Sequence, residues 1–182
     1  MDAMLWSLVG VSAAVAWIGL LRYSDTRPDT RLWPPHQGSL PTAVWAWGLT
    51  LLIYLGVLQA GFADPNSLGL SQALRWGLGG ALVVAGTIPH SWGTLALGIK
   101  GTSGYPVALS RGGIYGWRRH PQYLGQTLML LGLAVFAGTL WAVWPAVAGA
   151  CALGYAAFVE DRHLAATAPE HAAYRGATRA FL

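Results

Sequence analysis

Long uncharged apolar blocks dominate the hydrophobic pattern of this chain. Five such blocks alternate with polar segments, at residues 4–21, 43–60, 76–97, 123–138 and 141–159. A helix needs roughly 20 apolar residues to cross the hydrocarbon core of a bilayer, and interfacial aromatic and arginine side chains can extend a shorter block. The third block can be ended at 88 or continued to 97. The pattern predicts about five transmembrane helices.

Composition agrees with this pattern. Of the 182 residues, 54% are hydrophobic and 10% are charged, whereas a soluble domain has roughly 25% charged residues. The chain has 10 tryptophans and 24 glycines; aromatic rings favour bilayer interfaces, and small residues let membrane helices approach closely. We therefore expect an all-α integral membrane helical bundle that forms a single domain over residues 1–182.

The last two blocks are separated by only a few residues around Gly138. They should form a tight antiparallel helical hairpin, and Pro145 inside the fifth block is a candidate kink. The hairpin places the start of the fourth helix beside the end of the fifth.

Basic residues are distributed unevenly between the two sides that five spans define. Ten of the eleven Lys and Arg residues fall in segments on one side, and Arg75 is the exception. The positive-inside rule makes that side cytoplasmic, with the N-terminus outside and the C-terminus inside, as in a prokaryotic inner membrane. The first block could also be read as a signal peptide, but its start has no basic region and Arg22 follows as an anchor, so we favour an uncleaved helix.

The net charge of +4 does not indicate nucleic acid as a partner. Its arginines are spread over three segments, with no basic helix or aromatic platform, and contact with membrane lipids accounts for them better. The single cysteine, Cys151, allows no internal disulfide and no cysteine-based metal site. The sequence leaves the oligomeric state open.

Candidate chemistry gathers at the predicted cytoplasmic face. The stretch "GIYGWRRHPQYLG" at 113–125 precedes the fourth block, and Glu160 and Asp161 follow the fifth. The hairpin brings Arg119 and His120 to the same end as this acidic pair. Such clusters suit a zwitterionic ligand with a cationic centre, because Arg and His can hold a carboxylate and the acids an ammonium. The alternative is a membrane anchor with a salt bridge between helices.

The stretch also resembles a known pattern. It is similar to the G-x-Y-x-x-x-R-H-P-x-Y-x-G motif of the isoprenylcysteine carboxyl methyltransferase and phospholipid N-methyltransferase superfamily. Leu109 matches a leucine before that motif, and Glu160 and Asp161 with Leu164 resemble the family's E-E-x-x-L signature. A closing Y…R-x-F segment of the family corresponds to Tyr174, Arg179 and Phe181.

The resemblance implies a small membrane enzyme that uses S-adenosylmethionine (SAM) and needs no metal. It places the cofactor segments at 105–125 and 160–182. The residues that it implies for cofactor binding are Leu109, Gly113, Tyr115, Arg119, His120, Pro121, Tyr123, Gly125, Glu160 and Asp161.

The sequence departs from the family pattern in three places. Val107 stands where the family often has a histidine, Asp161 replaces a glutamate, and 168–169 lacks the usual F-G. These departures weaken any transfer of fine cofactor contacts or of substrate.

The predicted reaction is methyl transfer to an amphipathic or lipid-like acceptor: a prenyl-cysteine-type carboxylate, a phospholipid amine or a small hydrophobic thiol. We expect Glu160 to orient the SAM ammonium or accept a proton, and Arg179 to hold an acidic acceptor. Two alternatives remain open at this point. One is an NADPH-dependent membrane reductase of related architecture, and the other is a non-enzymatic membrane scaffold.

Overall fold

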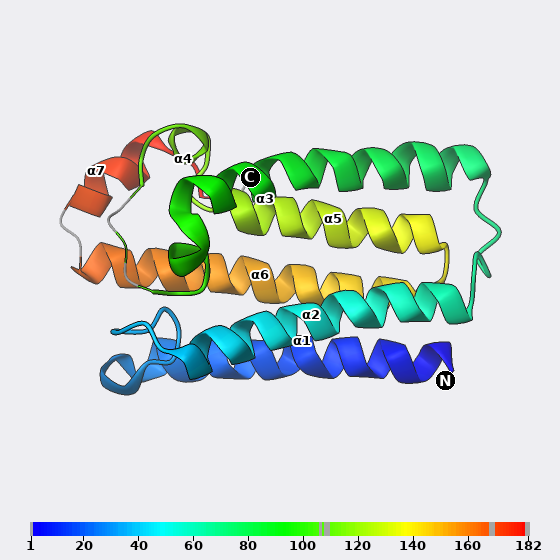
Figure 1. Cartoon of the computed structure of the whole chain (residues 1–182), viewed down its shortest axis with the longest axis horizontal. Helices are drawn as coiled ribbons and strands as arrows, with labels where there is room; N and C mark the ends of the chain where they lie inside the picture. The colour runs from blue at the N-terminus through cyan, green and yellow to red at the C-terminus, as the bar shows by residue number, and fades with distance from the viewer. Residues whose placement is uncertain (1, 106, 108–109, 168–169, 181–182) are drawn as a thin grey trace.

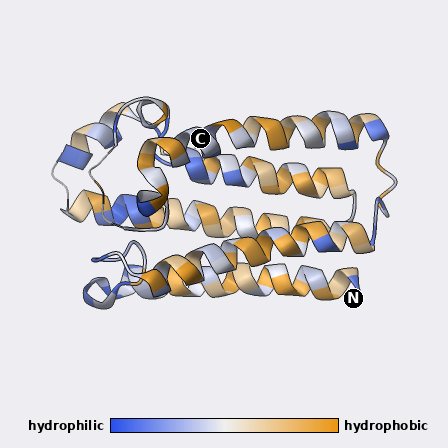
Figure 2. Cartoon of the chain, in the orientation of Figure 1, coloured by the Kyte–Doolittle hydropathy of each residue, from blue (hydrophilic) through white to orange (hydrophobic). Residues whose placement is uncertain are grey.

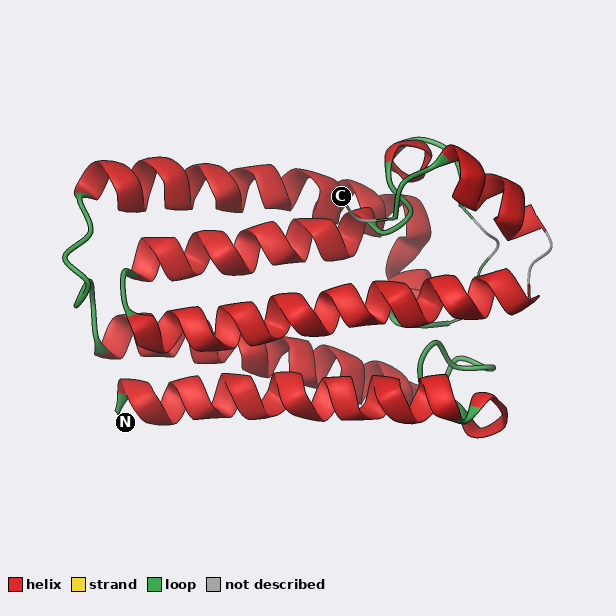
Figure 3. Cartoon of the chain, turned by 180° about the vertical axis from the view of Figure 1, so that it is seen from behind, coloured by secondary structure: helices red, strands yellow, loops and turns green. Residues whose placement is uncertain are grey.

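The computed structural model describes residues 2–105, 107, 110–167 and 170–180. Five long helices run side by side in alternating directions (Figures 1 and 3). They are α1 (Ala3–Thr26), α2 (Leu40–Ala63), α3 (Gly80–Thr102), α5 (Pro121–Ala137) and α6 (Leu140–Thr167). Shorter elements are η1 (Pro28–Thr30), the π-helical η2 (Ala73–Gly79) that leads into α3, α4 (Ile114–Trp117) and α7 (Glu170–Ala177). The described residues form no β-strand, which confirms the predicted all-α class.

Four helices are long and apolar enough to cross a membrane. They are α1, α2, α6 and the continuous helical segment Ala73–Thr102. The helix predicted at 123–138 is α5, and it has 17 residues, about 25 Å at 1.5 Å per residue against a core of about 30 Å. The middle parts of the long helices are mainly apolar, and polar residues gather at the two ends of the bundle (Figure 2). The chain therefore forms an integral membrane helical bundle.

Small residues set the packing at the centre of the bundle. Helix α6 packs against α1, α2 and α5, and its buried face includes the completely buried Ala142, Ala146, Ala152 and Ala156. Alanine at these positions allows the neighbouring helices to approach closely. Helix α3 lies outside this core and packs along α5.

Local signals determine where the helices begin and end. The Asp2 carboxylate accepts from the Met4 N–H at 3.2 Å to cap α1, and the Ser39 hydroxyl caps α2 through Thr42 N at 3.2 Å. Gly138 ends α5 in a left-handed conformation (φ 67°), so α6 starts two residues later. This confirms the predicted hairpin.

The third helix extends further than the sequence pattern predicts. It continues past 97 to Thr102, through a kink at Gly98 where φ is 73°. His90 therefore lies well inside the helix. The polar character of residues 98–102 conceals this last part of the helix.

Candidate active site

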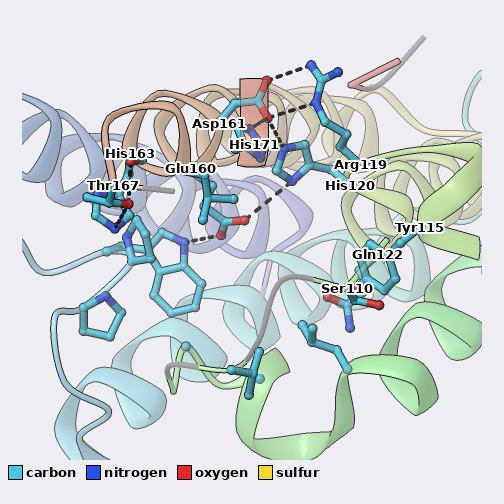
Figure 4. Close-up of a pocket in the computed structure, with 18 of the residues that line it drawn as sticks. Ser110, Tyr115, Arg119, His120, Gln122, Glu160, Asp161, His163, Thr167 and His171 are labelled. Atoms are coloured by element: carbon cyan, nitrogen blue, oxygen red, sulfur yellow. Dashed lines mark hydrogen bonds and ion pairs between the residues drawn. The ribbon is translucent and has the colours of Figure 1, made fainter. Parts of the chain in front are cut away.

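A cavity of about 600 Å³ lies at the end of the bundle where α5 begins and α3 and α6 end. Five parts of the chain meet around it: the α1–α2 connection, the end of α3, the segment before α5, the end of α6, and α7. The side chains that carry polar or aromatic groups into its wall include Arg31, Trp33, His36, Tyr105, Ser110, Tyr115, Arg119, His120, Gln122, Tyr123, Glu160, Asp161, His163, Glu170, His171 and Tyr174. Figure 4 shows most of this wall.

A buried ion pair joins the start of α5 to the end of α6. Arg119 Nε lies 3.0 Å from Asp161 Oδ1, and Arg119 Nη2 lies 2.7 Å from Asp161 Oδ2. Nη1 of the same guanidinium donates to the carbonyls of Thr178 and Arg175. The bidentate pair holds the two helices in a fixed orientation, and it uses most of the donors of Arg119.

His120 lies between the two carboxylates. Its Nε2 is 3.4 Å from Asp161 Oδ1, and its Nδ1 is 3.5 Å from Glu160 Oε2. Burial favours the neutral ring and lowers its pKa, but hydrogen bonds and charge from Asp161 and Glu160 outweigh burial, so the pKa of His120 is raised overall. The protonated ring is therefore favoured at this position.

Glu160 accepts hydrogen bonds from two aromatic side chains. Trp33 Nε1 donates to Glu160 Oε1 at 2.6 Å, and the Tyr123 hydroxyl donates to the same oxygen. Trp33 comes from the α1–α2 connection, so this bond ties that segment to α6. The carboxylate is held in the cavity wall by donors from two different parts of the chain, the α1–α2 connection and α5.

Helix α7 covers one side of the cavity. His171 is completely buried, and its Nε2 lies 3.2 Å from Asp161 Oδ1. The Tyr174 hydroxyl donates to the Tyr115 carbonyl at 2.6 Å. Burial lowers the pKa of His171 and raises that of Tyr174, so both side chains are favoured in their neutral forms.

The structure brings together six of the residues predicted for the site. The ones that line the cavity are Tyr115, Arg119, His120, Tyr123, Glu160 and Asp161. The carbonyl of Arg179 accepts from the Arg119 N–H at 3.0 Å, but the Arg179 side chain is exposed and is not part of the cavity wall.

The remaining predicted residues lie elsewhere. Gly113 is the N-cap of α4 and Pro121 begins α5, and neither lines the cavity. Gly125 faces α3: a Cβ there would come within 2.4 Å of the Gly86 carbonyl oxygen, so its place in the fold is the α3–α5 contact. Leu109 and Phe181 lie outside the described residues.

Sequence reasoning missed the α1–α2 connection. Arg31, Trp33 and His36 from this segment line the cavity, together with His163 and His171 from the end of the chain. The signal available was "RLWPPHQG" at 31–38, which combines basic, aromatic and proline residues at the predicted cytoplasmic face. The charge of Arg31 was explained there by topology alone.

Comparison with known proteins shows the family to which this chain belongs. The profile of the phospholipid methyltransferase family matches residues 74–167, just over half of the chain. The chain is also 32% identical over 164 residues to the cobalt-zinc-cadmium resistance protein CzcN of Cupriavidus metallidurans, covering 84% of this chain and 73% of that protein. No solved structure matches the chain. The bundle and its cavity thus belong to a membrane protein of methyltransferase type, and the chain is a member of the phospholipid methyltransferase family.

Proposed function

We propose that this protein is a SAM-dependent methyltransferase that acts on an amphipathic or lipid-like acceptor at the cytoplasmic face of the membrane. The observation that carries the proposal is the cavity in which Arg119 and His120 meet Glu160 and Asp161. These residues come from two motifs about 40 positions apart, both within the family match. The family match supports the reaction class, and the cavity supports its proposed location.

The cavity residues fit the cofactor in size and chemistry. A volume of about 600 Å³ lies within the range of about 300–1,000 Å³ typical of sites for drug-sized ligands. Glu160 offers a carboxylate to an ammonium or sulfonium, and the aromatic rings of Trp33, Tyr115 and Tyr123 offer faces for a heterocycle or a cationic centre. Glu160, Tyr115 and Tyr123 would hold the cofactor, and Trp33 keeps the carboxylate oriented.

SAM supplies a methyl group already activated by its sulfonium charge. The protein's own tasks are to orient the acceptor for in-line attack and to exclude water. Glu160 is placed to fix a cation or to accept a proton from an amine acceptor, since two donors hold its carboxylate at the cavity wall. A carboxylate or thiolate acceptor needs no proton transfer.

A second, smaller cavity supports a membrane-derived acceptor. Its volume is about 70 Å³, and it shares Trp33, Tyr123 and Glu160 with the main cavity before reaching Trp17 and Gln126 in the bundle. Within the described chain, Trp17 Nε1 and Gln126 Oε1 are buried and have no hydrogen-bond partner. A polar headgroup that enters this chamber would satisfy both atoms.

The walls of this chamber support lateral entry. The backbones of α2 and α3 do not approach each other closely anywhere in the described part of the chain, although both flank α5. Trp47 on α2 lines the chamber and bridges to the Ser103 hydroxyl at 3.0 Å, just after α3. An acyl or prenyl chain could lie between α2 and α3 while its polar end reaches Glu160.

The same geometry supports a proposed orientation in the membrane. The cavity end of the bundle holds the basic connections, and the N-terminus lies at the opposite end (Figure 1). By the positive-inside rule, the cavity opens to the cytoplasm and the N-terminus lies outside. Soluble SAM would then enter from the cytoplasm and the acceptor from the bilayer, in an inner-membrane protein if the source is prokaryotic.

CzcN is named for metal resistance, and we assign no metal to this chain. Among the described residues, no group of three or more His, Cys, Asp or Glu side chains is arranged to hold a metal ion.

The test is ligand binding followed by turnover. Purified protein in detergent is titrated with SAM, S-adenosylhomocysteine and NADPH by calorimetry. It is then incubated with methyl-labelled SAM and three acceptors: a farnesyl-cysteine, phosphatidylethanolamine vesicles and an alkyl thiol. We expect binding of both adenosyl ligands, and label transferred to at least one acceptor. Binding of NADPH alone would replace the proposal with a reductase, and binding of none of the three would favour a non-enzymatic scaffold.

A further inference from the structure

Arg31 is a half-buried cation in the cavity wall, and its partners among the described residues are neutral. Its Nη1 is hydrogen-bonded to His163 Nδ1, and its Nη2 lies 3.0 Å from His36 Nδ1. Because a guanidinium can only donate, both imidazoles accept through Nδ1 and are neutral. His36 Nε2, which then carries the proton, donates to the Pro28 carbonyl at 2.7 Å. The two histidines orient Arg31 and do not neutralise it.

No carboxylate in the described chain lies within ion-pair distance of Arg31. The guanidinium also keeps Nε–H buried without a partner, and further N–H groups remain on Nη1 and Nη2. Burial lowers the pKa of Arg31, which reflects the same desolvation of the charged side chain. A guanidinium stays charged in proteins. A half-buried guanidinium without an anionic partner is therefore unfavourable, unless a bound ligand provides the anion.

Arg119, unlike Arg31, is paired with a carboxylate. Its guanidinium makes a bidentate pair with Asp161 and two further bonds to carbonyls of the C-terminal segment. Its charge is already compensated inside the protein, so it has little capacity to bind a ligand anion. Of these two arginines in the cavity wall, Arg31 is the one whose charge is available.

The position of Arg31 relative to Glu160 defines the ligand chemistry. Arg31 contacts His163, and Trp33, two residues further on, contacts Glu160. Glu160 and His163 are three residues apart on α6, a rise of about 4.5 Å along the helix. Figure 4 shows His163 beside Glu160, on the side away from Arg119. An anion site therefore lies about one helical turn from a cation site, which matches the adjacent carboxylate and ammonium of an α-amino acid.

We propose that Arg31, oriented by His36 and His163, binds a ligand carboxylate at this end of the cavity, beside an ammonium bound to Glu160. The proposal rests on the function proposed above and deepens it. The carboxylate has two sources: the amino-acid end of SAM, or an acidic acceptor such as a prenyl-cysteine.

The experiment compares two nucleosides that differ in the amino-acid end. S-adenosylhomocysteine carries the carboxylate and ammonium, and 5′-methylthioadenosine lacks both. Affinities are measured by calorimetry for the parent, Arg31→Gln, Arg31→Lys and the control Arg27→Gln. Arg27 is an exposed arginine of the same connection that does not line the cavity.

If Arg31 binds the carboxylate of the cofactor, we expect Arg31→Gln to weaken S-adenosylhomocysteine binding by about 10- to 100-fold, because a charge-assisted hydrogen bond is lost. Binding of 5′-methylthioadenosine should change by less than about 3-fold, which also shows that the variant is folded. Arg31→Lys should retain part of the affinity, because the charge remains while the planar fork is lost. Arg27→Gln should bind both nucleosides as the parent does.

If the bound carboxylate belongs to the acceptor, Arg31→Gln should leave the affinities for both nucleosides unchanged. Arg31→Gln then raises KM for a farnesyl-cysteine at least about 10-fold and leaves KM for a neutral acceptor unchanged. If Arg31→Gln alters neither nucleoside binding nor the farnesyl-cysteine KM, the anion site is wrong while the methyltransferase proposal stands. A parent protein that binds neither nucleoside overturns both.

Discussion

Both ends of the helical bundle carry a cluster of polar residues. At one end these residues bond to one another, and at the other end they face a cavity. At the α5–α6 turn, Asp64 accepts from the Ser67 hydroxyl at 2.6 Å and from the Thr139 hydroxyl at 2.5 Å. The Asn66 N–H completes the cluster by donating to the Ala137 carbonyl at 2.9 Å. These groups satisfy one another. At the other end, Arg31 and Glu160 face an open volume of about 600 Å³.

The comparison shows which property distinguishes a binding site from a structural cluster. Acidic and hydroxyl groups occur at both ends, so residue type does not separate them. What separates them is hydrogen-bonding capacity that the protein itself leaves unused, next to space for a ligand. The following predictions test this difference, from the largest expected effect to the smallest.

Asp161 should be the most sensitive position in the molecule. Replacing it with Ala leaves Arg119, His120 and His171 without their shared acceptor, and removing one partner of a buried ion pair costs about 3–5 kcal/mol. We expect Asp161→Ala to lose that much unfolding free energy in detergent and to lose S-adenosylhomocysteine binding. The matched control at the other end is Asp64→Ala, which should bind the ligand normally. Loss of binding in both variants would mean that the two ends are not functionally distinct.

Trp33 should affect catalysis more than stability. Trp33→Phe removes the Nε1–H donor to Glu160 but keeps most of the aromatic packing. A hydrogen bond to a charged group is worth about 1.5–3 kcal/mol, so kcat/KM for methyl transfer should fall about 10- to 100-fold. Circular dichroism and thermal unfolding should resemble those of the parent. A variant with full activity would show that the orientation of Glu160 does not matter.

The charge on His120 should make stability depend on pH. Its pKa is raised in the folded protein, so the stabilising contribution is complete below the unfolded value of about 6.5 and is lost as pH rises through the higher folded value. The measurement is the unfolding free energy from pH 6 upward for the parent and for His120→Gln. The difference between the two should shrink as pH rises. A difference that stays constant over this range would indicate that the pKa of His120 is the same in the folded and unfolded states.

Thr139 should affect stability alone. Thr139→Val keeps the shape of this fully buried side chain but removes its bond to Asp64. We expect a loss of about 1 kcal/mol in unfolding free energy and an unchanged affinity for S-adenosylhomocysteine. A weaker ligand affinity would reveal coupling between the two ends of the bundle.

Arg179 should give the smallest effect. Its side chain is exposed, and its contact with Arg119 is made by its backbone carbonyl. Arg179→Gln should therefore change kcat/KM by less than about 3-fold, within the range of exposed substitutions. A loss of 10-fold or more confined to acidic acceptors would restore the role in acceptor binding that the sequence motif suggested.

Much of the fold was predictable because bilayer-spanning helices leave a strong hydrophobic signal. Blocks 4–21 and 43–60 both fall within helices of 24 residues. The short 138–140 connector also fixed the hairpin, and with it the meeting of His120 and Glu160. The polar end of α3 was missed because residues 98–102 have no apolar pattern.

The site was predictable only where contacts follow from the topology. Arg119 and Asp161 are brought together by the hairpin alone, and the structure has them paired. Arg31 and Trp33 could not be placed, because an irregular connection has no periodicity that indicates which way its side chains point. Gly125 shows the opposite problem: it belongs to the same motif as His120, yet its backbone contacts α3 and not the cavity.

The C-terminal segment is attached to the site mainly through its backbone. Arg119 donates to the carbonyls of Arg175 and Thr178, and the N–H groups of Arg119 and His120 donate to the carbonyls of Arg179 and Ala180. Carbonyl acceptors are present whatever side chain a residue carries. Over evolutionary time, substitutions should therefore accumulate in 175–180 much faster than at Arg119, while the same attachment persists. Distant relatives of this protein would then be found more reliably from the arginine–histidine motif than from the sequence of the tail.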